Sequence, residues 1–461
     1  MTVKKVIDCL GEVEVPIEVL YAAQTARAIN NFPISGQRMP VNFIRALLLA
    51  KWAAAEANAE LTLLEQPTAA AIGAAVEQLL ADPNMMQHFP IDIFQTGSAT
   101  SSNMNANEVL STLVSATLGE QVDANDVINM GQSSNDIIPS TIHISALLAL
   151  EHSLFPALAL LVETIQTKAL QVDDVVKTGR THLMDAMPVR MSQVLDGWAS
   201  QIEQCIAMIQ ALRDPLSALG QGGTAVGTGV NTHSAFGPVF CDKLTALTLV
   251  KFRPADNLFS RMGSHDTAVA LSGQLKTLAV AIMKISNDLR WMNSGPLAGL
   301  AEIALQPLQP GSSIMPGKVN PVIPEAACMV AAQVMGNDTV ITIAGQSGNF
   351  ELNVMQPVIA CNLLHSIEIL SNVSRLLADN AIASFTVNQT KLAESLSHNP
   401  ILVTALTPRV GYALAAKIVK QADDQGRSII DVAEALTPLS RDELTRLLDP
   451  KRLTYGGLTQ D

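Results

Sequence analysis

Four short segments of this chain carry hydroxyl and amide side chains at close spacing. They are TGSATSSNMN from Thr96, GQSSND from Gly131, GRTH from Gly179, and GSSIMPGKVNP, Gly311–Pro321. Hydroxyls, amides and backbone N–H groups bind carboxylate oxygens, and the lysine of the last segment adds a cation. Serine and asparagine also form turns and cap helices, so each segment alone has a structural interpretation. Four such segments, each ahead of a long helical pattern, are more than turns require and indicate a site for an anionic substrate.

The segment Gly311–Pro321 is similar to a phosphate-binding P-loop in composition but not in spacing. Five residues rather than four separate Gly311 from Gly317, and Val319 follows the lysine where that loop needs Ser or Thr. GQGGTA, Gly220–Ala225, has a loose dinucleotide-binding spacing, but no strand-like pattern precedes it. The sequence therefore does not favour a nucleotide site.

Metal and hydrolase chemistry also lack their usual patterns. None of the eight histidines stands at ligand spacing from another His, a Cys or a carboxylate. The chain contains no G-x-S-x-G nucleophile elbow. We expect neither a metal site nor a serine hydrolase.

The composition is that of a packed, mainly helical protein. Of 461 residues, 48% are apolar and only 4% are aromatic, so the core must consist of Ala, Leu, Val, Ile and Met. Such residues favour helices that pack closely on one another. Charged residues make up only 15% of the chain, which leaves apolar helix faces to be buried between subunits. We expect a homo-oligomer.

The charge pattern excludes several partners. The net charge is −13 and no basic stripe occurs, so nucleic acid and anionic membranes are poor partners. The N-terminus has no long apolar targeting segment, and no uninterrupted apolar run of about 18 residues follows, so we expect a soluble, cytoplasmic protein. The five cysteines are odd in number and widely spaced, which predicts free thiols in a reducing compartment.

Helical periodicity divides the chain into three textures. Up to about residue 130, short helical patterns alternate with loops, and the last 70 or so residues carry short polar helices with capping serines at Ser428 and Ser440. Between them, apolar residues recur at helical spacing over long stretches. These stretches are Ser140–Gln171, Val189–Leu212, His265–Asn293, Glu325–Ile343 and Cys361–Ala383.

In these segments the sequence resembles the fumarase/aspartase superfamily, and within it the class II fumarate hydratases. GSSIMPGKVNP is that superfamily's signature, and GSATSSNMNANEV, GQSSND, KTGRTHLMDA, GGTAVGTGVNTH and GNFELNV extend the match. The resemblance implies a mainly α fold of three domains: an N-terminal lyase domain over residues 1–132, a central long-helix bundle over 133–389 and a small helical domain over 390–461. It also implies a homotetramer with a 20-helix core, whose active sites each draw on three subunits.

The resemblance implies roles for particular residues. The reaction would be the reversible, stereospecific hydration of fumarate to L-malate in the tricarboxylic acid cycle, without metal or organic cofactor. Ser312 would take the C3 proton of malate, and His182, supported by Glu325, would handle the water. Both carboxylates would be held by Ser98, Ala99, Thr100, Ser133, Ser134, Asn135, Thr181, Ser313, Lys318, Val319 and Asn320. Fixed donors and a cation suit this chemistry, because proton removal beside a carboxylate gives an aci-carboxylate with added negative charge.

Two alternatives share these motifs. Aspartate ammonia-lyases carry the same signature and differ in the leaving group; Ser134, GGTAVGTGVNTH and GNFELNV favour the hydratase. A catalytically inactive structural homologue would be expected to lose Ser312, His182 or Lys318, and all three are present.

One segment departs from the family pattern. Where relatives commonly have His-Pro-Asn-Asp at a second carboxylate site, this chain has Asp123, Ala124, Asn125 and Asp126. A carboxylate in place of an imidazole repels an anion. The sequence predicts that this second site is weak or absent.

Overall fold

The computed structural model describes residues 2–457, so the first residue and the last four residues of the predicted terminal domains lie outside the described part. Its contacts form two compact units. The first comprises Met1–Ala157, Cys205–Val280 and Val330–Asn372, and the second comprises Leu158–Gln204, Ala281–Met329 and Val373–Asp461. The division at residues 132 and 389 remains a prediction.

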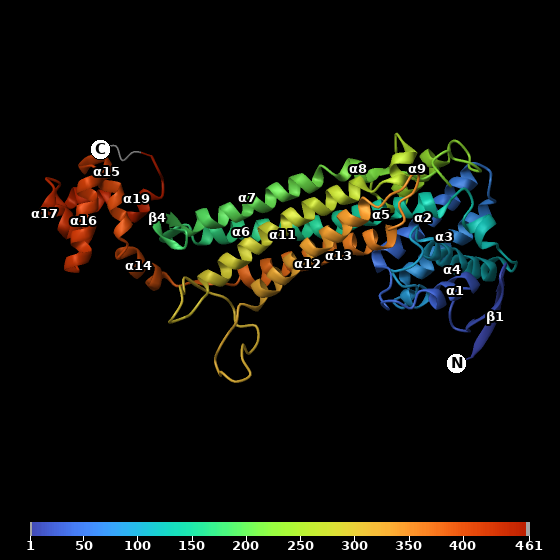
Figure 1. Ribbon diagram of the computed structural model, residues 1–461, viewed down its shortest axis with the longest axis horizontal. Coiled ribbons are helices and arrows are strands. Elements are labelled where there is room, and N and C mark those ends of the chain that lie inside the picture. Colours follow the sequence, from blue (N-terminus) through green and yellow to red (C-terminus); the bar gives the residue numbers. More distant parts are fainter. Residues whose placement is uncertain (1, 458–461) are drawn as a thin grey trace. The chain divides into compact units, whose positions relative to one another are not determined.

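The N-terminal part of the first unit is a hairpin followed by packed helices (Figure 1). Its elements are β1 (Val3–Asp8), β2 (Gly11–Pro16), α1 (Ala23–Asn31), α2 (Val41–Glu60), α3 (Gln66–Ala81), η1 (Met85–His88), α4 (Thr100–Leu118) and η2 (Ala124–Ile128). The strands β1 and β2 pair antiparallel. The buried carboxylate of Glu108 accepts hydrogen bonds from the N–H groups of Ala22, Gln24 and Thr25 at 2.8–3.1 Å. A side chain of α4 thus caps the start of α1, which has no cap of its own.

The long helices predicted from periodicity are confirmed to within a few residues at most of their ends. They are α5–η3–α6 (Ser134–Ala149, Leu150–Leu154, Phe155–Gln171), α7 (Met191–Gln210), α11 (Asp266–Met292), α12 (Val322–Gly345) and α13 (Gln356–Leu377), which η4 (Ala378–Ile382) continues. The first starts six residues earlier than predicted because Ser133 caps it. Its π-helical turn at η3 precedes Pro156, which has no N–H to continue the regular ladder.

The first unit is completed by short elements between α7 and α11. They are α8 (Arg213–Ser217), β5 (Ala218–Leu219), α9 (Phe236–Thr248), β6 (Arg253–Pro254) and α10 (Leu258–Gly263). The two-residue strand β5, which directly precedes Gly220–Ala225, pairs parallel with β6. The expectation that nothing strand-like precedes this segment was therefore wrong. The next α-helix begins only at Phe236, so the segment does not open a helix as a dinucleotide site requires.

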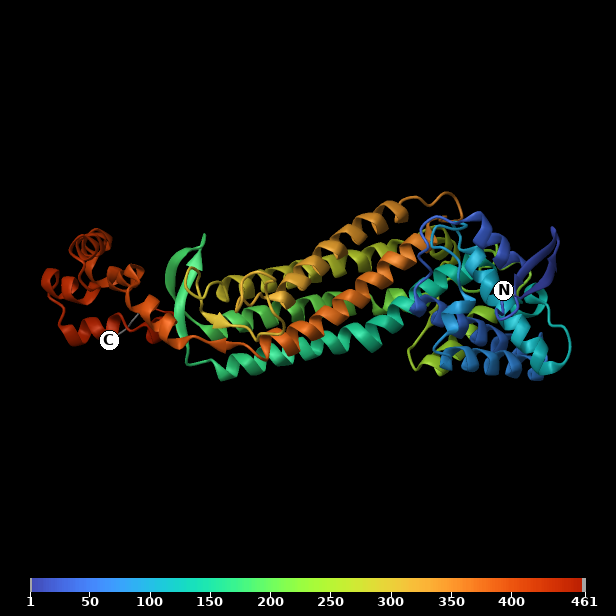
Figure 2. The ribbon, with the colours of Figure 1, turned by 90° about the horizontal axis from the view of Figure 1, so that it is seen from below.

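The second unit contains a hairpin that the sequence analysis did not predict. β3 (Val176–Thr181) and β4 (Met184–Arg190) pair antiparallel, and Figure 2 shows them as a two-stranded ribbon. GRTH therefore lies in a hairpin and not simply ahead of a helix. The remaining elements are β7 (Ile303–Ala304), β8 (Thr386–Val387), α14 (Gln389–Ser397), η5 (Pro400–Leu406), α15 (Thr407–Val410), α16 (Tyr412–Gln425), α17 (Ile429–Leu436), α18 (Arg441–Leu447) and α19 (Pro450–Leu453).

The C-terminal helices have a hydrophobic cluster of their own. Leu406, Ile418, Val432 and Leu444 are fully buried in it. Ser428 and Ser440 cap α17 and α18 by accepting the N–H groups three residues ahead, as predicted.

Three helical segments are long and apolar enough to cross a membrane by length and composition. They are Ser134–Gln171, Asp266–Met292 and Val322–Gly345, with mean hydropathies of 1.7, 1.4 and 1.3 in their most apolar windows. None of the three is an uninterrupted apolar run, because ionisable residues interrupt each of them. In the first unit, Asp338 of α12 accepts hydrogen bonds from Ser272 and Lys276 of α11 at 2.7 and 2.6 Å. These ionisable side chains therefore connect α11 to α12.

We predict that His265 makes the protein acid-sensitive. Its ring is 1% exposed and, among the described residues, neither nitrogen has a hydrogen-bond partner. Burial lowers the pKa of His265 from 6.5 to about 4. The unfolded chain therefore takes up the proton first as the pH falls below 6.5, and stability is lost from there toward pH 4. At pH 5 the loss is about 2 kcal/mol.

The measurement is the melting temperature of His265→Leu and wild type at pH 7.5 and pH 5. The variant should lose less stability on acidification. His152→Gln, which changes an exposed histidine, is the control. Equal acid sensitivity in all three proteins would contradict the assignment.

Candidate active site

The first unit presents two of the predicted substrate loops. Before α4, the hydroxyls of Ser98 and Thr100 lie 2.8 Å apart, and Ala99 between them takes a left-handed conformation with φ of 54°. Gly97 precedes this turn, and a Cβ there would meet the carbonyl oxygen of Val354 at 1.9 Å. The loop therefore needs glycine at this close approach.

The second loop, GQSSND, ends at the start of α5. The Asp136 carboxylate accepts the N–H of Ser133 at 2.9 Å and the Ser133 side chain accepts the N–H of Asp136, which together form a capping box. The hydroxyl of Ser133 also accepts the N–H of Asn135 at 3.2 Å. Asp136 also accepts the N–H groups of Gly222 and Thr224 at 3.1 and 2.9 Å, so it ties this loop to the glycine-rich segment. Burial raises the pKa of Asp136 to about 6.

Several loop residues that could have contacted a ligand instead make internal bonds. Ser102 donates to the side-chain oxygen of Gln95 at 2.9 Å, and Asn105 donates to the carbonyl oxygen of His88 at 2.9 Å. Asn103 is 1% exposed and donates to the hydroxyl of Ser134 at 3.1 Å. They all lie on α4 behind the loop, and sequence spacing alone did not separate them from Ser98 and Thr100.

In the second unit, His182 occupies the turn of the β3–β4 hairpin. Thr181 ends β3, and His182 and Leu183 have φ of 55° and 61°. Two-residue hairpin turns of this kind normally use Asn-Gly, because positive φ is unfavourable for a branched side chain such as leucine. A strained, exposed histidine at a turn is the kind of outlier that marks a functional position.

A buried charge cluster supports the hairpin. Glu302 accepts a hydrogen bond from Lys177 at 2.5 Å and a short one from Arg180. The side chains of Lys177 and Glu302 are 5% and 4% exposed. Burial lowers the pKa of Lys177, and the Glu302 charge opposes that shift. Sequence reasoning missed this cluster because Glu302 lies 122 and 125 residues along the chain from Arg180 and Lys177.

The signature loop connects α11 to α12 in the second unit. The hydroxyl oxygen of Ser312 accepts the N–H groups of Ile314 and Met315 at 3.2 and 3.0 Å. The N–H of Gly311 donates to the carbonyl oxygen of Lys318 at 2.9 Å, where a Cβ on residue 311 would clash at 2.4 Å.

The polar side chains of this loop are linked to each other. The ammonium of Lys318 donates to the side-chain oxygen of Asn320 at 2.7 Å, and the Asn320 amide donates to the carbonyl oxygen of Gly311 at 2.6 Å. Ser313 and Val319 are exposed on the same loop.

Two hollows of the second unit adjoin the loop. One of about 440 Å³ is lined by Pro307–Ser312 and Met315–Val319, which places Ser312 and Lys318 on its wall. The other, of about 1080 Å³, is lined by Lys318, Val319, Asn320 and Glu325 together with residues of α11 and β7. Within residues 2–457, no hydrogen bond joins His182 to Glu325 or Ser312.

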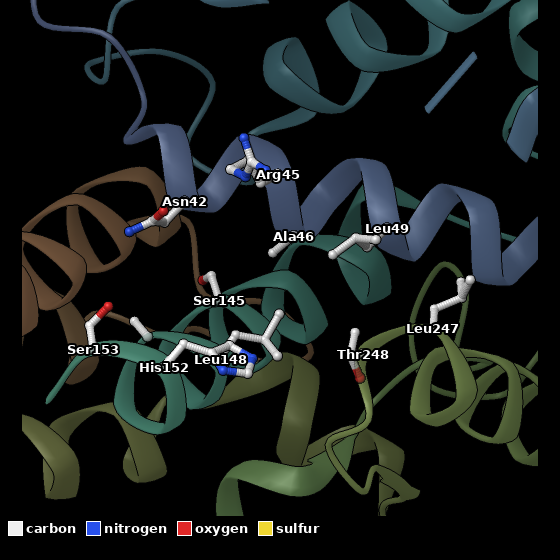
Figure 3. Close-up of a pocket in the computed structure, with 11 residues that line it drawn as sticks. Asn42, Arg45, Ala46, Leu49, Ser145, Leu148, His152, Ser153, Leu247 and Thr248 are labelled. Atoms are coloured by element: carbon white, nitrogen blue, oxygen red, sulfur yellow. The ribbon is translucent and has the colours of Figure 1, made fainter. Parts of the chain in front are cut away.

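A further cavity of about 310 Å³ lies in the first unit between α2, α5, η3 and α9. Figure 3 shows Arg45 pointing away from Ser145, and its guanidinium donates to the carbonyl oxygen of Leu80 at 3.3 Å. None of the predicted site residues lines it. Residues 2–457 contain no cluster of three or more His, Cys, Asp or Glu side chains that could bind a metal ion.

Comparison with known proteins assigns the chain to a family. Residues 11–336 match the lyase family, and residues 402–455 match the fumarase C C-terminus. The chain is 65% identical over 451 residues to fumarate hydratase class II 2 of Pseudomonas aeruginosa, with 98% of each chain covered. The chain belongs to the class II fumarate hydratases.

The chain is also similar to other class II fumarate hydratases. That of Xylella fastidiosa is 53% identical, with 98% of this chain and 95% of the relative covered. The crystal structure of a class II fumarase from Schistosoma mansoni superposes with a TM-score of 0.95 at 36% identity, covering 98% of this chain and 99% of that one. The prediction of the hydratase branch over the ammonia-lyase branch is confirmed.

Proposed function

We propose that this class II fumarate hydratase interconverts fumarate and L-malate with Ser312 as the proton acceptor. The geometry of the signature loop carries the proposal. A serine hydroxyl is a weak base, and its alkoxide needs stabilisation. Two backbone N–H groups already point at the Ser312 oxygen, and Lys318 shares its loop.

The remaining predicted residues supply binding and water chemistry in this proposal. Lys318, Asn320, Ser313 and the hydroxyls of the other loops would bind the two carboxylates and the charge that develops when the C3 proton leaves. His182 would pass the proton to or from the C2 oxygen, and Glu325 would orient it. Positive φ at the hairpin turn presents His182 at the tip, where a substrate can reach it.

The site is tested by assaying the purified protein with L-malate and, separately, L-aspartate while following the absorbance of fumarate. Fumarate from malate alone is the expected result. Fumarate from aspartate instead would assign an ammonia-lyase, and no product from either substrate would favour the non-catalytic homologue.

We further propose a homotetramer in which five long helices from each of four subunits build the core. The apolar helix α12 supports this, because only 33% of its most apolar window is buried within one chain. Met329, Val340 and Ile343 of α12 are 69%, 38% and 52% exposed. Exposure of such an apolar surface to water is unfavourable, and contact with other subunits would bury it. Sedimentation should give four times 48.9 kDa; a monomer would contradict the proposal.

Shared active sites would explain why His182 meets neither Ser312 nor Glu325 within one chain. Co-expression of His182→Asn and Ser312→Ala subunits tests this. Mixed tetramers should recover part of the activity if the two side chains of a site come from different subunits. No recovery would place them on the same chain.

We also infer a soluble, cytoplasmic enzyme that acts on small dicarboxylates without nucleic acid, membrane, metal or organic cofactor. Ionisable pairs inside the apolar helices, such as Lys276 with Asp338, support an aqueous location.

Finally, we propose that the second carboxylate site is weak or absent. The Asp123 carboxylate accepts the N–H groups of Asn125 and Asp126 at 2.7 and 2.8 Å. These are the donors that an anion would use at such a helix start. Titration should therefore find one malate per subunit, and Asp123→Gly should expose the donors and add weak anion binding. A second malate in wild type would contradict the proposal.

A further inference from the structure

A buried polar cluster lies directly behind Ser134 in the first unit. Lys51 of α2 is 1% exposed and donates to the side-chain oxygens of Asn129 and Gln132 at 2.9 and 2.8 Å. The same oxygen of Asn129 accepts from the amides of Asn103 and Asn107 at 3.1 and 3.2 Å. The cluster thus joins α2, α4 and the loop before α5.

The direction of every hydrogen bond in this cluster is determined. The Asn129 amide nitrogen donates to the carbonyl oxygen of Gln132, and the Gln132 amide nitrogen donates to the carbonyl oxygens of Ile128 and Met130. Backbone carbonyls accept only, so the amide oxygens must face Lys51. Lys51 itself offers only donors to them while it carries its charge.

The consequence passes through Asn103 to Ser134. Because the oxygen of Asn129 faces Asn103, the group that Asn103 presents must be its NH₂. The same nitrogen lies 3.1 Å from the hydroxyl oxygen of Ser134. The Ser134 oxygen therefore accepts from behind, and its proton is free to point away from the cluster.

We propose that Asn103 is a positioning residue that makes Ser134 a hydrogen-bond donor toward the substrate carboxylate, with Lys51 and Asn129 holding Asn103 in the required orientation. The inference rests on the proposed function, in which Ser134 contacts a carboxylate. A carboxylate accepts hydrogen bonds only, so a serine whose lone pairs face inward and whose proton faces outward is matched to it.

The arrangement does not depend on the charge of Lys51. Burial lowers the pKa of Lys51 to about 7, and the charge of Asp136 opposes the shift. A neutral amine retains two N–H donors, which suffice for its two acceptors. The backbone carbonyls that orient Asn129 and Gln132 do not titrate.

The test reverses the hydrogen-bond polarity at Asn103 without changing its shape. In Asn103→Asp, a carboxylate that only accepts faces Ser134, so the serine proton turns inward and its bond to the substrate is lost. We expect KM for L-malate to rise by about tenfold or more, since a hydrogen bond to a charged group contributes about 1.5–3 kcal/mol. kcat should change much less, because the bond holds ground state and transition state alike.

Asn107→Asp is the matched control. Asn107 lies one turn further along α4, is fully buried and donates to the same oxygen of Asn129, but it makes no bond to Ser134. Its KM should stay at the wild-type value even where its melting temperature falls. Equal KM values in the two variants would overturn the proposal. If Asn103→Asp does not fold, Asn103→Leu gives the opposite test, because leucine offers Ser134 no acceptor and leaves its proton free to reach the substrate. KM of Asn103→Leu should then stay close to that of Asn107→Leu, and a tenfold rise in Asn103→Leu alone would overturn the proposal.

Ser134→Ala separates failure of this inference from failure of the proposed function. In that background, Asn103→Asp should no longer change KM, because the group through which it acts is absent. An active wild type whose KM is unaffected by Ser134→Ala would overturn the inference and leave the hydratase activity in place. An inactive wild type would instead contradict the proposed function.

Discussion

Ser312→Ala is expected to lower kcat for malate dehydration by about 10²–10⁴-fold, the usual contribution of a general base. The substitution removes the oxygen at which two backbone N–H groups converge, and leaves Lys318, Asn320 and the loop backbone. KM should change little, because these remaining groups bind the carboxylates. Steady-state measurement of fumarate release gives both constants.

Ser312→Asn distinguishes chemistry from loop structure. The hydroxyl of Ser312 receives N–H groups two and three residues ahead, which is also how a serine stabilises a turn. An asparagine oxygen can accept the same N–H groups but has no proton-accepting alkoxide form. Loss of kcat in both variants is the expected result. Recovery of activity in Ser312→Asn would reduce Ser312 to a turn former.

The sequence predicted best where local patterns determine structure. Apolar spacing in α11 and α12 extends over many turns, and the capping residues Ser428 and Ser440 act on N–H groups three residues away. The signature loop was recognisable for a similar reason, since its glycines and its Ser312 and Lys318 are contiguous.

Features that depend on contacts between distant parts of the chain could not be predicted from one sequence. Asn103 and Ser98 belong to one polar segment, yet Asn103 is buried and donates to Asn129, whereas Ser98 pairs with Thr100 in the loop before α4. Helical position separates them only once α2 is packed against α4. The β3–β4 hairpin was missed because its turn, His182 and Leu183, lacks the glycine that usually marks one.

Glu302→Gln is expected to destabilise the second unit by about 3–5 kcal/mol, because it leaves two cations without their buried counter-charge. Lys177 and Arg180 both donate to this carboxylate beneath the hairpin. Glutamine keeps the size and one oxygen but not the charge. Burial lowers the pKa of Lys177, and loss of Glu302 removes an opposing influence, so Lys177 releases its proton more easily in the variant. As the pH rises, the folded variant loses this proton before the unfolded chain does, and its stability relative to the unfolded chain increases. The difference in melting temperature between variant and wild type should therefore shrink from pH 7 toward pH 10.

Lys177→Met is the comparison that identifies the role of the cluster. It leaves Glu302 paired with Arg180 and should cost less than Glu302→Gln. In the Lys177→Met background, Glu302→Gln leaves only Arg180 without its counter-charge. The Arg180 side chain is 21% exposed and can reach water, so the two changes should couple by about 1–3 kcal/mol.

The hairpin also holds His182 and Leu183 at unfavourable positive φ, a conformation that the surrounding structure must maintain. Release of Arg180, two residues before His182, should therefore lower kcat as well as stability in Glu302→Gln. A variant that melts like wild type and retains full kcat would show that the strained turn is held by other contacts.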